Sequence, residues 1–296
     1  MVRDSVWRTG AEPTDVRSAS TVPDDHSGSA VVSGRYAPPV TASPLMHPMA
    51  DGFALHPERD QVVLLLHGWT GTPAQLRPLA DAIDAAGYGV VAPLLAGHGT
   101  HIDDILVTTW RDWVRSALEA IHDIGDDRPL HVAGLSMGAL IGILIAATGE
   151  VASLTTINAP IKVHDRMFRM SRALRGRRYI RSGDAAIHPA GYATEYHHDY
   201  RDTPVGTVAE LRDLIRGARR ALPRITTPTL VVQSRRDRTV RPESGQIIYD
   251  TLTAPRQLHW LEHSGHVATL DVERHLLGIE VVAHLDAASG RKPDAT

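Results

Sequence analysis

The chain contains 296 residues with a formal charge of −3 at pH 7; 43% of the residues are apolar and 22% are charged. A chain of this length and composition accommodates one large globular domain or two. The small net charge provides no chain-wide basic field for nucleic acid, so we expect no nucleic-acid partner. Because the sequence has no cysteine, disulfides, thiolate nucleophiles and cysteine-ligated zinc or iron–sulfur sites are excluded.

The N-terminal segment and the hydropathy pattern favour a cytoplasmic protein. No run of residues approaches the roughly 18 consecutive apolar residues that a membrane span requires. Residues 1–5 (MVRDS) lack the apolar stretch of a secretory signal. Residues 1–42 are rich in Ser, Asp, Thr, Pro and Gly and have no apolar periodicity, so we expect a disordered tail there.

From residue 43 onward, short apolar runs alternate with helical stretches, which is the pattern of a mostly parallel sheet flanked by helices. Each run is almost continuously apolar, as in strands that are buried on both faces. The predicted strands are 61–66, 88–92, 130–133, 154–157, 229–232 and 257–261. The predicted helices are 73–86, 108–124, 137–148, 242–252 and 271–285. We therefore expect an α/β core formed by residues 43–159 and 223–290.

Residues 160–222 interrupt this alternation and contain no convincing strand, so we expect a helical cap insertion above the edge of the sheet. Met167 and Met170 lie on the apolar side of a predicted amphipathic helix within it. The other side carries the basic residues Lys162, Arg166, Arg169, Arg172 and Arg175. The apolar side is expected to pack inward, with the basic side solvated; transient contact of the basic side with a membrane surface is the alternative.

A Gly-x-Ser-x-Gly motif, residues 134–138, stands between an apolar strand and a helix rich in Ala and Ile. In such a sharp turn the nucleophile occupies a strained position, and the residues two before and two after it must be nearly free of side chain. Ser136 would then project at the N-terminus of the following helix, where backbone N–H groups favour developing negative charge. The motif alone is weak evidence, but its placement makes Ser136 a candidate nucleophile.

A serine hydroxyl needs a base that a carboxylate orients. Asp237 follows the strand 229–232, and His266 follows the strand 257–261, so both lie in loops at the end of the sheet where open α/β folds place their sites. The chain order Ser, Asp, His, with each member after a strand, predicts a catalytic triad. Glu243 is the alternative acid and His263 the alternative base.

The oxyanion of acyl transfer needs two hydrogen-bond donors. The backbone N–H of Met137, directly after the nucleophile, is one candidate. The second is the backbone N–H of Trp69, in a loop where Gly68 and Gly71 allow a tight reversal; the Trp69 side chain is expected to line the pocket.

This chemistry requires no metal and no organic cofactor. The run His197-His198-Asp199 has the composition of a metal site, but it lacks a third ligand at a suitable spacing and falls in the insertion. We therefore predict no metal site.

From about residue 44 to 285 the sequence resembles the α/β-hydrolase superfamily, and more narrowly the small bacterial carboxylesterases and monoacylglycerol lipases. The segments that carry the resemblance are HGWTGTP (67–73), LAGHGT (95–100), TTWRDW (108–113), GLSMG (134–138) and HVATLD (266–271). The resemblance implies Ser136 as nucleophile, Asp237 as acid and His266 as base. It also implies that Trp69 and Met137 are the backbone donors of the oxyanion hole.

Two departures from the family pattern are present. Ala139 stands where a further glycine usually follows the motif. In the cap, monoacylglycerol lipases have an acid after the Tyr of a Tyr-x-x-Thr-Pro string, where it is thought to meet the glycerol head group. Arg201 occupies that place here, with Asp199 and Asp202 as the acids that could substitute for it.

The sequence thus predicts an esterase that cleaves carboxylic esters with an uncharged, hydrophobic acyl group through an acyl-enzyme. The expected substrate-binding residues are Ile161, Met167, Met170, Ile187 and Arg201. Acyl transfer to another acceptor, and thioester or lysophospholipid hydrolysis, use the same acyl-enzyme and remain alternatives. A non-catalytic lipid binder with the same fold is the alternative from another class. The oligomeric state is left open.

Overall fold

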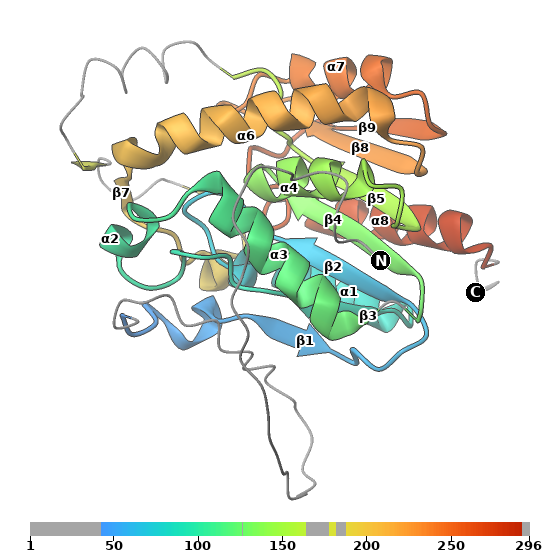
Figure 1. Cartoon of the computed structure of the whole chain (residues 1–296), viewed down its shortest axis with the longest axis horizontal. Coiled ribbons are helices and arrows are strands. Elements are labelled where there is room, and N and C mark those ends of the chain that lie inside the picture. Colours follow the sequence, from blue (N-terminus) through green and yellow to red (C-terminus); the bar gives the residue numbers. More distant parts are fainter. Residues whose placement is uncertain (1–42, 126, 164–177, 182–187, 292–296) are drawn as a thin grey trace, which may run out of the picture.

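A seven-stranded sheet forms the centre of the molecule, with the strand order β1-β3-β2-β4-β5-β8-β9 (Figure 1). The computed structural model describes residues 43–125, 127–163, 178–181 and 188–291. The strands are β1 (Phe53–Leu55), β2 (Val62–Leu66), β3 (Gly89–Ala92), β4 (Leu130–Leu135), β5 (Ser153–Ile157), β8 (Thr229–Ser234) and β9 (Arg256–Leu261). β1 pairs antiparallel with β3, and every other neighbouring pair in this sheet is parallel.

All six predicted strands are present, so the predicted fold class is confirmed. Two details differ. The sequence did not predict β1, which has three residues of intermediate burial and therefore lacks a continuous apolar run. The expectation that every strand is buried on both faces is wrong for β9, whose first two residues are exposed because it is an edge strand with one neighbour.

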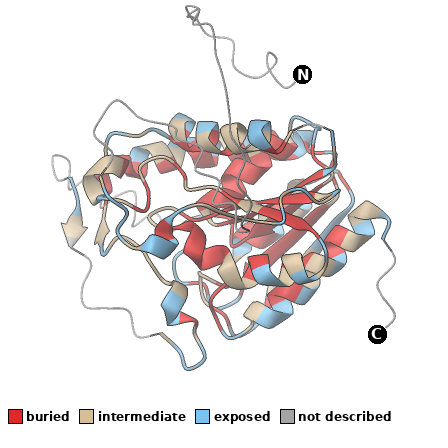
Figure 2. Ribbon diagram, turned by 90° about the horizontal axis from the view of Figure 1, so that it is seen from below, coloured by how far each residue is buried: buried red, intermediate tan, exposed pale blue. Residues whose placement is uncertain are grey.

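Helices cover both faces of the sheet, and the buried residues concentrate on the strands and on the inner sides of the helices (Figure 2). The α-helices are α1 (Arg77–Ala85), α2 (Ile102–Ile105), α3 (Trp110–Ile124), α4 (Met137–Ala146), α6 (Val208–Ala221), α7 (Glu243–Thr251) and α8 (Arg274–Ser289). The 3-10 helices are η1 (Pro48–Ala50), η2 (Pro73–Leu76), η3 (Thr194–Tyr196), η4 (Val205–Thr207) and η5 (Leu222–Arg224). None of the described helices has the length and apolarity to cross a membrane.

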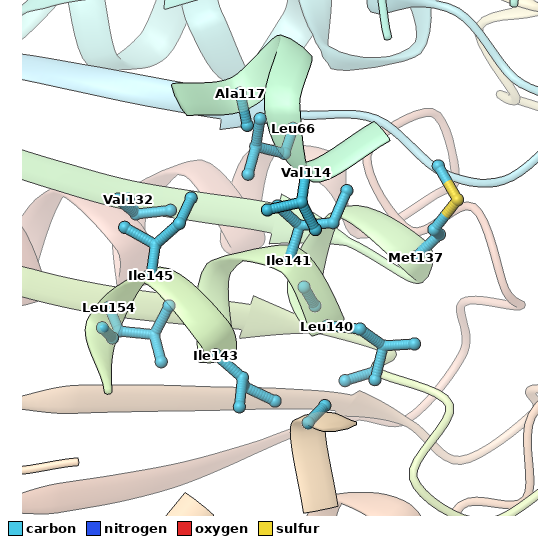
Figure 3. Packing of buried hydrophobic residues seen from close by; sticks show 14 of the residues in the cluster. Leu66, Val114, Ala117, Val132, Met137, Leu140, Ile141, Ile143, Ile145 and Leu154 are labelled. Carbon is cyan, nitrogen blue, oxygen red and sulfur yellow. The ribbon is translucent and has the colours of Figure 1, made fainter. Parts of the chain in front are cut away.

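Two hydrophobic clusters define the two faces of the sheet. The larger cluster contains the buried side chains of α3, α4 and α6, and the smaller one those of α1 and α8. α4 is buried almost all round because it lies between the sheet and its neighbouring helices. Figure 3 shows Ile141 and Ile145 of α4 among Leu66 and Val132 of the strands and Val114 of α3. Burying each such side chain contributes about 2 kcal/mol of stability, so α4 is held firmly against the sheet.

The expectation that residues 160–222 contain no strand is wrong. β6 (Ile180–Arg181) and β7 (Asp202–Thr203) pair antiparallel as a short separate ladder. The helix α6 packs against α4 and α3, so it belongs to the layer that covers the sheet (Figure 1). The predicted tail 1–42 and the predicted amphipathic helix with its methionines and most of its basic residues lie outside the described residues.

Candidate active site

The turn between β4 and α4 has the geometry that the Gly-x-Ser-x-Gly motif predicts. Ser136 has φ 54° and ψ −114°, in the left-handed half of φ space that side chains rarely adopt. A Cβ at Gly134 would overlap the backbone carbonyl of Gly138, and a Cβ at Gly138 would overlap the carbonyl of Leu66. Both glycines are therefore required by the close approach of three backbone segments. The Ser136 N–H also donates to the carbonyl of Ile157 in β5 (2.8 Å).

The structure brings the three predicted catalytic side chains together. His266 Nε2 lies 2.9 Å from Ser136 Oγ, and His266 Nδ1 lies 2.8 Å from Asp237 Oδ2. Because a carboxylate only accepts, Nδ1 carries the hydrogen of the neutral ring and Nε2 is free to accept the serine O–H. The Asp237 side chain is fully buried, whereas that of His266 is 19% exposed. The site therefore combines a shielded carboxylate with an imidazole that substrate can reach.

Two backbone amides hold the second oxygen of Asp237. The N–H groups of Thr239 and Val240 both donate to Oδ1, each at 2.8 Å. Oδ2 is thereby left for the imidazole. The acid is thus oriented by its own loop.

Two charged neighbours of Asp237 in sequence, Arg235 and Arg236, are engaged elsewhere. Arg235 pairs with Glu262 (3.1 Å) and lies over the ring of Trp260, and Arg236 contacts His263. The alternative acid, Glu243, lies 3.8 Å from Lys162. The alternative residues His263 and Glu243 therefore point to other partners, while Asp237 and His266 meet at the nucleophile.

Asn158, which the sequence analysis did not single out, connects the loops of the acid and the base. It follows β5 with φ 48°, and its side-chain amide donates to the carbonyl of His266 (2.7 Å) and to Ser234 Oγ (3.0 Å). Its side-chain oxygen accepts the N–H of Ser234 (2.7 Å). A polar residue directly after a predicted strand was the available signal, because the ends of parallel strands meet at this edge.

Two carboxylates organise the loop that carries His266. Glu273 accepts the backbone N–H groups of residues 262, 263 and 264 and the hydroxyl of Ser264. Asp271 accepts the N–H of Gly265 (2.7 Å) and that of Val272 (2.7 Å). The position of the imidazole is therefore fixed from both sides of the loop.

The two predicted oxyanion donors flank the nucleophile. Met137 opens α4, where a helix offers its first amides no partner. Trp69 lies in the loop after β2, directly beside Gly68, where an added Cβ would lie only 3.5 Å from Ser136 Cβ. Within the described part of the chain, no hydrogen bond occupies the Trp69 N–H. The Trp69 and Met137 amides therefore stay the candidate donors to a negatively charged oxygen beside Ser136.

A buried histidine supports the loop that carries Trp69. His67 Nδ1 lies 2.9 Å from the carbonyl oxygen of Gly68, and the N–H of Leu95 donates to His67 Nε2 (3.1 Å). Burial, together with the nearby His98, lowers the pKa of His67 to about 3. The ring is therefore neutral at physiological pH, with Nδ1 as donor, and joins the loop after β2 to the loop after β3.

The insertion contacts this loop at two points and the following helix η2 at a third. The N–H of Tyr200 donates to the carbonyl of Thr70 (3.1 Å), and the Trp69 indole N–H donates to Thr207 Oγ1 (3.1 Å). The Gln75 side chain donates to Asp199 Oδ1 (2.5 Å). No sequence pattern marks Gln75 or Thr207, because only the tertiary structure brings these segments together.

The residues expected to bind substrate have different positions. Ile161 is buried in the larger hydrophobic cluster, in the segment that follows β5, and Arg201 is exposed. Met167, Met170 and Ile187 lie outside the described residues.

Within the run 197–199, His197 pairs with Asp199, whereas His198 turns to a different partner. His197 Nε2 lies 3.1 Å from Asp199, and the hydrogen bond to Asp199 raises the pKa of His197. The ring of His198 stacks on His47 at a centroid distance of 3.9 Å. Among the residues that the structure describes, no group of three His, Cys, Asp or Glu residues is arranged to hold a metal ion.

Comparison with known proteins agrees with this geometry. Residues 63–275 match the model of the alpha/beta hydrolase family. The chain belongs to the α/β-hydrolase family. A carboxylesterase of Bacillus subtilis (strain 168) is 32% identical over 234 residues, which cover 77% of this chain and 93% of that protein. A thermostable monoacylglycerol lipase of Bacillus sp. (strain H-257) is 33% identical over 219 residues, covering 73% and 86%.

A solved structure reported for the metagenome-derived lipolytic enzymes LipS and LipT superposes on this α/β-hydrolase with a TM-score of 0.75. It is 30% identical and covers 81% of this chain and 98% of its own. The predicted family and fold are confirmed, and the prediction of a carboxylic ester hydrolase agrees with the names of these relatives.

Proposed function

We propose that this α/β-hydrolase is a serine esterase that cleaves carboxylic esters with a hydrophobic acyl group through an acyl-enzyme. The observation that carries the proposal is the hydrogen-bonded series Ser136–His266–Asp237, with contacts of 2.9 and 2.8 Å, on a strained turn beside two available backbone amides. The names of the relatives support the ester bond as the target.

In the acylation step, Ser136 Oγ attacks the carbonyl carbon of the ester while His266 Nε2 takes the hydroxyl proton. Asp237 accepts the Nδ1–H and stabilises the imidazolium that forms. The carbonyl oxygen becomes negatively charged and is bound by the N–H groups of Trp69 and Met137. The tetrahedral intermediate then expels the alcohol, which receives the proton from His266 Nε2.

Deacylation repeats these steps with water. The water oxygen attacks the acyl carbon, and His266 Nε2 takes one of its protons. The second tetrahedral intermediate breaks the bond to Ser136 Oγ, which recovers the proton as the free acid leaves. The chain's own residues thus supply the nucleophile, the acid–base group and the charge stabilisation for both halves of the reaction.

Two acids of the insertion, Asp199 and Asp202, are the candidates for recognising the alcohol part of the ester. Asp199 accepts hydrogen bonds from Gln75 and His197, and Asp202 lies half-buried in β7. Arg201 is exposed. The proposal therefore extends to esters of simple alcohols as well as to monoacylglycerols.

The test compares p-nitrophenyl esters from acetate to palmitate on the wild type and on Ser136→Ala. We expect the wild type to turn over and the variant to lose at least about 10³-fold in kcat. The matched control is Ser153→Ala, because Ser153 is a buried serine whose Oγ lies 2.8 Å from His131 Nδ1, at the start of β5 and away from the triad. This control should retain wild-type activity.

Labelling with a fluorophosphonate provides the second readout. The reagent should modify Ser136 in the wild type and in Ser153→Ala, but not in Ser136→Ala. A wild type that neither hydrolyses these esters nor reacts with the phosphonate would contradict the proposal. Product analysis in the presence of added alcohols separates hydrolysis from acyl transfer, since a transferase forms the new ester in preference to the free acid.

A further inference from the structure

Trp69 lies between a glycine and a residue with a strained backbone. Gly68 precedes it, and Thr70 follows with φ 68°, a conformation that is unfavourable for a β-branched residue. The Trp69 N–H belongs to the Gly68–Trp69 peptide, whose carbonyl accepts from His67 Nδ1 (2.9 Å) and from the N–H of Gly71 (3.2 Å). The Gly68 end of this peptide is therefore held within the loop, and the Trp69 end needs further groups to hold it. An oxyanion donor is effective only when its direction is fixed before the reaction.

The insertion, together with the Thr70 hydroxyl, holds the backbone on the Trp69 side of this peptide. The Thr70 carbonyl accepts the N–H of Tyr200, and the Thr70 hydroxyl donates to the carbonyl of Trp69 (2.6 Å). Tyr200 is itself fixed, since its hydroxyl lies 2.8 Å from the carbonyl of Gly97. The backbone on the C-terminal side of Trp69 is therefore tied to the insertion.

The Trp69 side chain is tied by Thr207. The Thr207 hydroxyl donates its only proton to the carbonyl of Pro204 (3.0 Å), so toward the Trp69 indole N–H (3.1 Å) it acts as an acceptor. Thr207 is 1% exposed and ends η4, and the next helix, α6, buries its apolar face in the larger hydrophobic cluster. The acceptor is therefore rigidly placed.

We propose that Thr207 is a positioning residue for the oxyanion hole: by accepting the Trp69 indole N–H, it fixes the direction in which the Trp69 backbone N–H points. This inference rests on the proposed function, because it assigns a role within the same acyl-transfer site. Among the described residues, no hydrogen bond joins Thr207 to Ser136 or His266, so we expect its effect to pass through Trp69.

The test uses Thr207→Val, which keeps the shape of the side chain and removes the acceptor, and Thr207→Ser, which restores a hydroxyl. Thr229→Val is the matched control: Thr229 is also fully buried and donates to a backbone carbonyl (Thr227, 2.9 Å), but it stands at the start of β8, the end of the strand away from the site. Urea unfolding verifies that each variant is folded.

The probe is an alkyl trifluoromethyl ketone. Ser136 Oγ bonds to its carbonyl carbon, the serine proton moves to His266, and the ketone oxygen becomes the anion in the oxyanion hole. The matching trifluoromethyl carbinol has the same chain but cannot accept the serine. Its inhibition constant therefore reports pocket shape without the oxyanion.

Removing a whole oxyanion donor costs 10²–10³-fold, so misdirecting one should cost about tenfold. We expect Thr207→Val to raise the ketone inhibition constant, and to lower kcat/KM for p-nitrophenyl butyrate, by this same factor. The carbinol constant should stay unchanged, and Thr207→Ser and Thr229→Val should behave as the wild type. Trp69→Phe removes the same hydrogen bond from the other partner, so Thr207→Val should cause no further loss in that background.

An unchanged inhibition constant for the ketone in folded Thr207→Val would overturn the inference. An equal rise in the inhibition constants of ketone and carbinol would also overturn it, because a changed pocket wall affects both compounds alike. If Thr207→Val does not fold, Trp69→Phe decides by the same two constants. A wild type that binds ketone no more tightly than carbinol would instead refute the proposed function. Failure of the inference and failure of the function are thus distinguished by the wild-type ratio.

Discussion

Replacing Gly138 by alanine tests whether the approach of α4 to the end of β2 sets the active-site geometry. A Cβ at this position would overlap the carbonyl group of Leu66 and lie 2.8 Å from the carbonyl oxygen of His67. Ordinary carbon–oxygen contacts are about 3.3 Å or longer, so the His67 carbonyl must withdraw by about 0.5 Å and that of Leu66 by more. Both obstacles are backbone atoms, so no side-chain rotation relieves them.

The displacement separates two parts of the catalytic site. Ser136 and the Met137 amide move with α4, whereas the Trp69 amide moves with the loop after β2. A misplacement of about 1 Å costs roughly 100-fold in rate, and we expect kcat for p-nitrophenyl butyrate to fall by at least that factor. Overpacking should also lower the free energy of unfolding by about 1–3 kcal/mol.

Gly142→Ala, one turn further along α4, is the matched control. Its Cβ would meet only methyl groups, Leu154 Cδ1 at 3.1 Å and Val132 Cγ1 at 3.2 Å, which can yield slightly. Rates are measured per phosphonate-reactive site, and stability by urea unfolding. If folded Gly138→Ala keeps a kcat close to that of Gly142→Ala, the close approach does not govern catalysis and the reasoning is refuted.

Three further predictions concern the triad and its surroundings. Asp237→Asn should lower kcat by about 10³–10⁴-fold, because the imidazole loses the partner that orients it. Glu243→Gln, measured in parallel, should keep a kcat close to that of the wild type. A larger loss of kcat in Glu243→Gln than in Asp237→Asn would identify Glu243 as the acid. Asn158→Ala removes the bonds to the carbonyl of His266 and to Ser234, and it should lower kcat more than it raises KM; a change confined to KM would contradict a role in holding the base. Burial lowers the pKa of His67 to about 3 and that of His98 to about 4, so both stay neutral in the folded protein at pH 5 while the unfolded chain binds the protons. The free energy of unfolding should therefore fall as the pH drops below about 6.5, by about 2 kcal/mol per histidine at pH 5. The fall should be smaller in His98→Gln. Urea titrations that give a pH-independent free energy of unfolding for the wild type would exclude this contribution.

The sequence determined the features that depend on neighbouring residues. A parallel sheet covered on both faces produces continuous apolar runs, and these predicted six of the seven strands of the main sheet. The turn at Ser136 is equally local, because its two glycines are needed within four residues of each other. Asp237 and His266 were predictable since the carboxyl ends of adjacent parallel strands meet at one edge, so their place in the chain implies their place in space.

The helix α6 was indicated by a weaker sequence pattern, whereas the strand β1 left none. Leu211, Leu214, Ile215 and Ala218 recur at helical spacing and are all buried in α6, so this periodicity indicated a core helix inside the segment expected to form the cap. β1 has only three residues, at an antiparallel edge, and its burial is intermediate. A strand this short and half-buried has too few residues to show a period.

Only the tertiary structure decided the contacts that hold the site in register. Thr207 lies 138 residues from Trp69, Gln75 lies 124 residues from Asp199, and Asn158 lies 108 residues from His266. Nothing in the local sequence marks Thr207 or Gln75, and the position of Asn158 after a strand does not identify its partners, because a hydrogen bond depends on where a partner arrives after folding. The catalytic groups follow from local pattern and sheet topology, whereas their alignment follows from long-range packing that brings the insertion onto the loop after β2.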